Sequence, residues 1–172
     1  MFHLTSKKNM NKYSGNVSDF QPVVEDASRV VISYGLEVTD GDMATWYELV
    51  FYKKKGKPSF EQVKAAVLAD INERIKAKIV GGFVWNEKPV WLSEENQMNF
   101  AQAVVPATFK IGETEDGTPI YHEFNTKTEL KQFNEACVLW KQECLSQGWT
   151  EKDSMDWSPY EDYFAPTTAN EQ

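Results

Sequence analysis

Apolar residues recur at steps of three and four after residue 59, the spacing that is typical of an amphipathic α-helix. Ser59, with Gln62 three residues later, forms a capping-box pattern at the start of this run. Gly81 is expected to end it in the left-handed conformation that often terminates helices. We therefore predict a helix whose buried stripe consists of Phe60, Val63, Val67, Ile71, Ile75 and Ile79.

Short runs of β-branched and aromatic residues, separated by residues that favour turns, predict three β-hairpins. The first turn is expected at Asp40-Gly41-Asp42, the second at Asn86-Glu87-Lys88-Pro89, and the third in the acidic loop 112–119. The strands that these turns join are residues 29–38 and 45–53, 83–85 and 90–92, and 109–111 and 120–124.

Two further capped helices are predicted after the second and third hairpins. Ser93 begins a helix that runs to about Val105. Thr126 and Glu129 form a second capping box, and the helix that follows is expected to stop at Gly148. The expected apolar positions are Met98, Ala101, Val104 and, more weakly, Phe100 in the first helix, and Leu130, Phe133, Cys137, Trp140 and Cys144 in the second.

Together these elements predict an α+β fold in which three β-hairpins alternate with three amphipathic helices around one core. The sheets are expected to pack on the helix faces that carry Val63 and Phe133. We expect a single domain at residues 29–149, preceded by a polar N-terminal arm at 1–28 and followed by an acidic, aromatic and irregular tail at 150–172.

Charge and hydropathy narrow the classes of partner. The 172 residues carry a net charge of −8, which argues against binding to a phosphate backbone. No apolar run approaches the length of a membrane span. We therefore expect neither a nucleic-acid partner nor a membrane partner.

The residues with reactive side chains match no known catalytic or metal-binding pattern. Cys137 and Cys144 are seven residues apart in one predicted helix, so a rise of about 10.5 Å places them beyond disulfide reach. We interpret both as small buried hydrophobic residues. His3 and His122 are isolated in the sequence. We predict no enzyme, no catalytic or cofactor-binding residue, no metal site and no cofactor.

Two tryptophans flank the second predicted turn and admit two interpretations. Trp85 and Trp91 are six residues apart, so they are expected to be neighbours across the hairpin. Such a pair commonly stabilises a hairpin or packs on a helix, and this is the interpretation that we favour. Stacking on a ligand such as a sugar ring is the alternative.

The C-terminal tail combines aromatic residues with carboxylates, a composition typical of a docking segment. We predict that these aromatic side chains bind an apolar groove on a neighbouring chain, with the carboxylates at the rim of the contact. Truncation after Gly148 would then leave the domain folded but unable to assemble. The expected partner-binding residues are Trp157, Tyr160, Tyr163 and Phe164.

The chain also resembles a family of phage tail-associated domains of unknown function. The resemblance rests on the runs 63–72, 81–93 and 95–100, followed by a hairpin, a capped helix and Gly148-Trp149. It implies a domain encoded in tail or tail-fibre gene modules of phages and prophages. The longer acidic loop 112–119 and the aromatic tail depart from the usual pattern of that family.

The resemblance implies a non-enzymatic virion structural or virion-assembly protein that acts through protein–protein contacts. Its partners would be other virion or assembly proteins, and further copies of itself in a homo-oligomer are an additional candidate. Such a protein would lie in the host cytoplasm during synthesis and in the virion if it is structural. The alternative is a small cytoplasmic protein-binding or regulatory module encoded by a phage or prophage.

Overall fold

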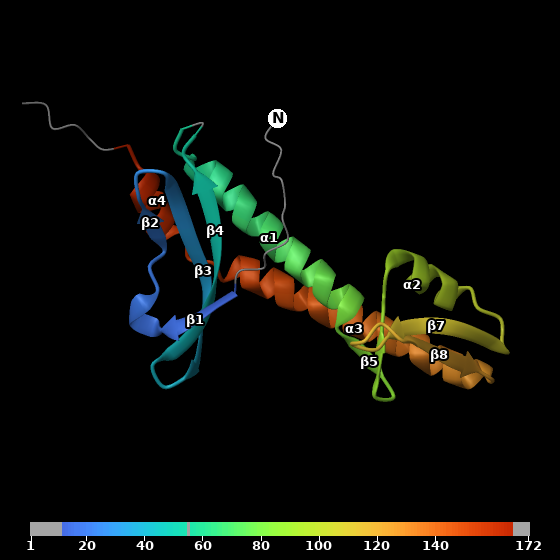
Figure 1. Cartoon of the computed structure of the whole chain (residues 1–172). Coiled ribbons are helices and arrows are strands. Elements are labelled where there is room, and N and C mark those ends of the chain that lie inside the picture. The colour runs from blue at the N-terminus through green and yellow to red at the C-terminus, as the bar shows by residue number, and fades with distance from the viewer. Residues whose placement is uncertain (1–11, 55, 167–172) are drawn as a thin grey trace, which may run out of the picture. The chain divides into compact units, whose positions relative to one another are not determined.

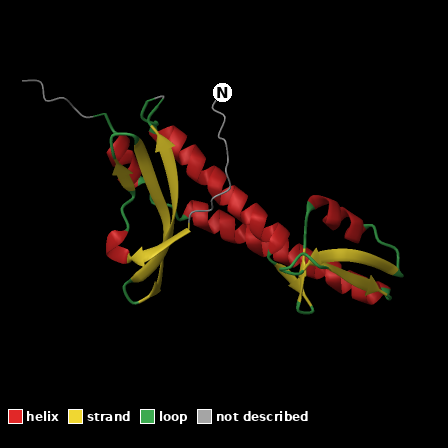
Figure 2. Ribbon diagram, in the orientation of Figure 1, coloured by secondary structure: helices red, strands yellow, loops and turns green. Residues whose placement is uncertain are grey.

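The computed structural model describes residues 12–54 and 56–166 and has a mixed α+β architecture, as the sequence predicts (Figures 1 and 2). Hairpins and helices alternate in the predicted order. In sequence the elements are β1 Lys12–Asn16, the 3-10 turn Val17–Asp19, β2 Val23–Glu25, β3 Arg29–Asp40, β4 Met43–Tyr52, α1 Phe60–Gly81, β5 Phe83–Trp85, β6 Lys88–Val90, α2 Glu94–Ala101, β7 Ala107–Glu113, β8 Pro119–Phe124, α3 Lys127–Asp153 and α4 Ser158–Phe164.

The described residues form two compact units, whereas the sequence predicts one core within residues 29–149. The first unit contains the residues up to Asp70 and those from Glu151 onward, and the second is Ile71–Thr150. The difference arises from helix length. The 22 residues of α1 span about 33 Å, which is longer than the core of one small domain. Its apolar stripe is therefore shared, with Val63 and Val67 in one unit and Ile79 in the other.

The first unit is built on a four-stranded antiparallel sheet in the order β1-β4-β3-β2. Val23 of β2 pairs with Ile32, and Gly15 of β1 pairs with Ala44. A Cβ at Gly15 would lie 2.9 Å from Cη2 of Trp46, so glycine is needed at this position. Residues 12–28 therefore contribute edge strands rather than the separate arm that the sequence predicts, and residues 1–11 of that arm lie outside the described residues.

The C-terminal region is more ordered than its polar composition predicts. Helix α3 does not stop at Gly148 but continues to Asp153, and α4 follows. Figure 1 shows α4 beside β2, against which it packs. Residues 150–166 of the predicted irregular tail are thus largely helical, and residues 167–172 lie outside the described residues.

In the second unit, two small hairpins and α2 pack against α3. Its buried core consists of Phe83, Val90, Leu92, Phe100, Ile111, Phe124, Leu130 and Phe133. Phe133 is fully buried, and its ring centroid lies 5.0 Å from that of Phe100 and 4.9 Å from that of Phe124. The predicted importance of the Phe133 face is confirmed.

Three local predictions in this unit are corrected. The second turn contains two residues, Asn86 and Glu87, both at positive φ, which is the type I′ geometry that suits a hairpin. Gly81 ends α1 with no positive φ. Helix α2 ends at Ala101 rather than near Val105, and it buries Phe100 instead of Met98. Phe100 is the buried residue because its large ring fills the aromatic core better than the side chains of the predicted apolar face could.

Candidate functional site

The structure brings the predicted partner-binding aromatic residues together, but it places them against their own chain. Tyr160 is buried, and its hydroxyl donates a 2.6 Å hydrogen bond to the Ser33 carbonyl in β3. The ring of Trp157 packs edge-on against Phe60 of α1 at a centroid distance of 6.1 Å. Tyr160 and Trp157 therefore pack within the first unit of their own chain, and binding of the tail aromatic residues to a neighbouring chain stays a prediction.

The remaining two tail aromatics belong to a small ionic cluster beside β2. The Tyr163 ring packs edge-on against Phe164 at 4.9 Å, and its hydroxyl bonds to the Glu25 carboxylate. Lys57 Nζ lies 4.1 Å from the centroid of the Tyr163 ring and 3.2 Å from the Glu25 Oε2 atom. Hydrogen bonds from Lys53 and Lys57 hold the pKa of Glu25 below its usual value. These contacts attach α4 to the sheet.

Trp85 and Trp91 are not brought together. The hairpin register pairs Trp85 with Lys88, so Trp91 lies beyond the paired residues of β6. Trp85 packs edge-on against Phe133 at 5.4 Å, whereas Trp91 is 41% exposed and Lys110 Nζ lies 5.6 Å from its ring centroid. The expected cross-strand pair is absent because the turn is two residues shorter than predicted. Trp85 thus has the packing role that the sequence favours.

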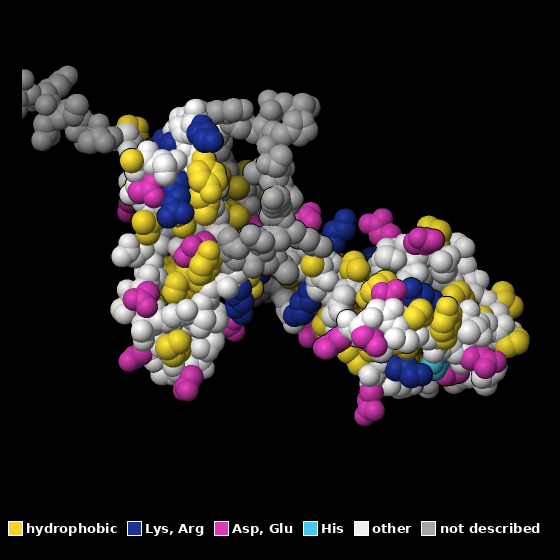
Figure 3. Space-filling view, viewed as in Figure 1, with side chains coloured by type: hydrophobic (Ala, Val, Ile, Leu, Met, Phe, Trp, Pro, Cys, Tyr) yellow, Lys and Arg dark blue, Asp and Glu magenta, His cyan; other side chains and the backbone are white. Residues whose placement is uncertain are grey.

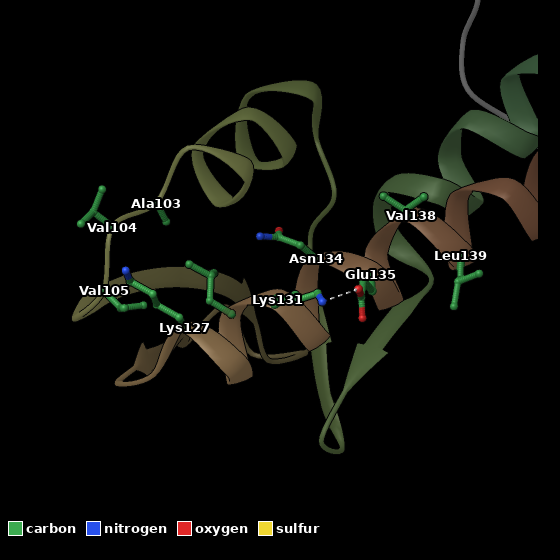
Figure 4. Close-up of a pocket in the computed structure, with 10 residues that line it drawn as sticks. Ala103, Val104, Val105, Lys127, Lys131, Asn134, Glu135, Val138 and Leu139 are labelled. Atoms are coloured by element: carbon green, nitrogen blue, oxygen red, sulfur yellow. Dashed lines mark ion pairs between the residues drawn. The ribbon is translucent and has the colours of Figure 1, made fainter.

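A groove in the second unit is the strongest candidate for a binding site (Figure 4). It has a volume of about 860 Å³, and it lies between the segment 103–105 and one face of α3. Asn134 Nδ2 donates a 3.1 Å hydrogen bond to the Phe100 carbonyl, which fixes α3 to the end of α2. The residues lining this α3 groove are Ala103, Val104, Val105, Lys127, Leu130, Lys131, Asn134, Glu135, Val138 and Leu139.

The rim of the α3 groove exposes aliphatic side chains. Val104 is 81% exposed, Leu139 is 64% exposed and Val138 is 54% exposed, while Leu130, which also lines the groove, is buried. The space-filling view shows further hydrophobic side chains among charged ones on the surface of this unit (Figure 3). Two exposed aliphatic residues on α3, together with Val104 on the facing segment, form a surface that is suited to contact with another protein.

The charged side chains that line the α3 groove are mostly basic, whereas the chain as a whole has a negative net charge. Lys127 and Lys131 line it, and the lone acidic lining residue is Glu135. Lys131 Nζ lies 3.7 Å from Glu135 Oε1, an exposed pair that contributes little to stability. The groove therefore presents an excess of positive charge on a chain of net charge −8.

Away from the groove, His122 and the two cysteines have structural surroundings. His122 Nε2 lies 2.9 Å from Glu129 Oε1, and its ring packs against Phe124. Both cysteines are free, and burial raises the pKa of the Cys137 thiol to about 12.

Within residues 12–54 and 56–166, no three His, Cys, Asp or Glu side chains gather as metal ligands would. Among the helices of those same residues, none has the length and apolarity needed to cross a membrane.

The α3 groove is a feature that sequence reasoning missed. Val138 and Leu139 lie off the stripe that packs into the core, and the sequence pattern places Val104 on the buried face of a longer helix. The available signal was the apolar pair Val138-Leu139, which adds hydrophobic residues beside an already complete stripe in α3. A helix with more apolar residues than its core-facing stripe needs is predicted to have a second contact surface.

Comparison with known proteins identifies one family. The model of a family described as "Domain of unknown function (DUF4376)" matches residues 62–168. This range includes the whole α3 groove and α4, and it begins after the four-stranded sheet. No curated protein and no solved structure matches the chain.

Proposed function

Since the chain belongs to the DUF4376 family, whose function is unknown, we propose its role from the α3 groove and from the resemblance noted above. The proposed role is that of a non-enzymatic phage virion structural or virion-assembly protein, associated with the tail or tail fibre. It acts through protein–protein contacts with other virion or assembly proteins. It is made in the host cytoplasm and enters the virion if it is structural.

The observation that carries this proposal is the exposure of Val104, Val138 and Leu139 on the rim of one groove. Taking a fully exposed side chain of this kind to full burial contributes roughly 1.5–3 kcal/mol of transfer free energy, and these three, which are already partly buried, contribute less. Part of that gain is offset by the loss of motional freedom on association. Three aliphatic side chains on one helix-backed surface therefore provide the central part of a small protein interface.

The resemblance of residues 63–149 to phage tail-associated domains supplies the biological setting of the proposal. The groove lies entirely within that region. A tail protein must form many copies of the same contact, and an exposed apolar surface on a folded domain suits this use.

Quantitative mass spectrometry of purified particles tests the proposal. Particles of the phage or prophage that encodes this chain are purified through a density gradient, and its copy number is measured against the major tail protein. We expect a constant ratio through successive purification steps. Loss of the chain during purification would contradict a structural role, and its complete absence from both particles and assembly intermediates would favour the cytoplasmic regulatory alternative.

A further inference from the structure

We propose that the outer edge of β4 is a strand-docking site whose occupant is the chain's own N-terminal segment, residues 7–11. In this arrangement the segment extends β1 along the part of β4 at Glu48–Tyr52. The inference concerns the first unit, whereas the α3 groove lies in the second, so it does not depend on the proposed function of that groove.

Strand β4 is longer than the strand that covers its outer edge. On its inner side, β3 pairs with β4 from Met43 to Tyr52. On its outer side, β1 pairs only with the residues from Met43 to Tyr47. Within residues 12–54 and 56–166, no strand pairs with the outer edge of Glu48–Tyr52. This edge spans about 17 Å, the length of five extended residues.

A hydrogen bond beside β1 shows which backbone groups this edge exposes. The Val17 N–H donates a 2.7 Å bond to the Asp42 carbonyl, in the same register as the pairs between β1 and β4. Hydrogen-bonded and non-bonded pairs alternate along an antiparallel ladder, so every second residue counted from Asp42 directs its N–H and C=O toward the outer edge. Beyond β1 these residues are Glu48, Val50 and Tyr52, and their backbone groups have no partner on this side among the described residues.

The N-terminal segment reaches this edge without a turn. The ladder between β1 and β4 has no irregularity and ends where Lys12 pairs with Tyr47. Eleven residues precede Lys12, more than the five that the edge requires. Because the segment is covalently joined to β1, its pairing closes no loop and loses none of the translational freedom that a second copy would lose. Continuing the register places Asn11 opposite Glu48, Asn9 opposite Val50 and Lys7 opposite Tyr52.

The apolar residue of this segment falls on the buried side of the sheet. In the continued register Met10 lies opposite Leu49, whose partner on β3 is the fully buried Ile32. A slip of one residue would place Met10 opposite Glu48 or Val50 instead, on the other face of the sheet. The alternation of apolar and polar positions therefore favours the continued register.

The lysines of the segment repeat a contact that the ladder already contains. Lys12 Nζ lies 5.8 Å from the ring centroid of Tyr47, the residue directly opposite. Four residues earlier on the same face, Lys8 falls opposite Phe51, so a second contact between a cation and an aromatic ring is available. Lysine on an edge strand also disfavours pairing with further strands. The segment therefore extends the sheet and closes the edge of β4 to other chains.

Amide hydrogen exchange, measured residue by residue by NMR on the full chain, tests the pairing. Successive N–H groups of a strand point to opposite edges, so the continued ladder predicts an alternating pattern of protection. We expect the amides of Asn9 and Val50 to exchange at least about tenfold more slowly than in an unstructured chain. The amides of Lys8 and Met10 point away from β4 and should exchange at nearly the unstructured rate. Equally fast exchange throughout residues 7–11 would overturn the inference.

Two neighbouring proline substitutions identify the occupant of the edge. Asn9→Pro removes an N–H that faces β4, whereas Lys8→Pro, the matched control, removes one that faces away, where edge strands tolerate proline. We expect Asn9→Pro to speed exchange of the Val50 amide by about tenfold or more and Lys8→Pro to change it by less than about twofold. Circular dichroism verifies that both variants are folded.

The same exchange data reveal any other occupant. Protection of the Val50 amide that Asn9→Pro leaves intact would show that a different segment covers the edge, and it would overturn the inference. Protection that increases with protein concentration would assign the edge to a second copy and would overturn it equally. Protection that is independent of concentration and is lost in Asn9→Pro alone supports pairing within one chain.

Discussion

Gly148 of α3 lies so close to Ile75 of α1 that a Cβ on the glycine would be 2.7 Å from Ile75 Cγ1. The same added Cβ would lie 3.3 Å from Ile75 Cδ1, so the obstruction is the longer branch of the side chain, beginning at the Cγ1 atom that is bonded to Ile75 Cβ. The glycine therefore allows the two helices to approach within the second unit. Trp140 Nε1 also donates a 3.3 Å hydrogen bond to the Ile79 carbonyl of α1.

We predict that Gly148→Ala destabilises the protein by about 1–3 kcal/mol, because overpacking outweighs the gain in helix propensity. Gly81→Ala is the matched control, since a Cβ at Gly81 meets nothing within 4 Å. Urea denaturation followed by circular dichroism measures both. Combining Gly148→Ala with Ile75→Ala should recover part of the loss, and strictly additive effects would contradict the contact.

Tyr160→Phe should lower the free energy of unfolding by about 1–2 kcal/mol, because the buried Ser33 carbonyl loses its hydrogen-bond donor. Thermal denaturation at neutral pH measures this change. Ser158→Ala, at an exposed position in the same helix, provides the comparison. An unchanged melting temperature in Tyr160→Phe would indicate that α4 does not pack on the sheet.

The same tyrosine predicts a dependence on alkaline pH. Burial, with a smaller effect of Asp156, raises the pKa of Tyr160 to about 12, from an ordinary value near 10. Between about pH 10 and pH 12, Tyr160 therefore keeps its proton in the folded state but loses it in the unfolded state. The associated stability is complete below about pH 10 and is lost as the pH rises toward 12. Denaturation measured across this range should show a smaller decline for Tyr160→Phe than for wild type.

Trp85 and Trp91 should respond differently to truncation. Trp85→Ala is expected to cost about 3 kcal/mol, because its ring packs on the buried Phe133. Trp91→Ala removes a ring that is 41% exposed and should cost less than about 1 kcal/mol. Chemical denaturation of the two variants measures both losses, and equal losses would revive the paired arrangement expected from the sequence.

Periodicity and capping signals predict most of the local structure. The α1 stripe, the three hairpins and the buried Phe133 all follow from residues near one another in sequence. The helix end predicted at Gly148 is wrong. A glycine can end a helix, or it can lie inside a helix where a neighbouring helix packs closely, and the sequence around it does not distinguish the two cases. The distinction depends on Ile75, which is 73 residues away.

The same limit applies to the terminal segments and to the α3 groove. Residues 12–28 and 150–166 are polar, but backbone pairing with β3 and β4 and burial of Tyr160 order them. The groove depends on which side of α2 faces the core, and Phe100 decides this through contacts with Phe109 and Phe133. These contacts join residues that are distant in sequence, so local patterns do not reveal them.

The α3 groove is, in our proposal, the surface through which the protein makes its contact in the phage particle. The most direct test is to express wild type, Val138→Glu and Val84→Glu during particle assembly and to measure the copy number of each per purified particle. We expect Val84→Glu to match wild type and Val138→Glu to be depleted by about tenfold, because a charge on the rim must be desolvated when the groove is covered. Incorporation of folded Val138→Glu at the wild-type level would contradict this role of the groove.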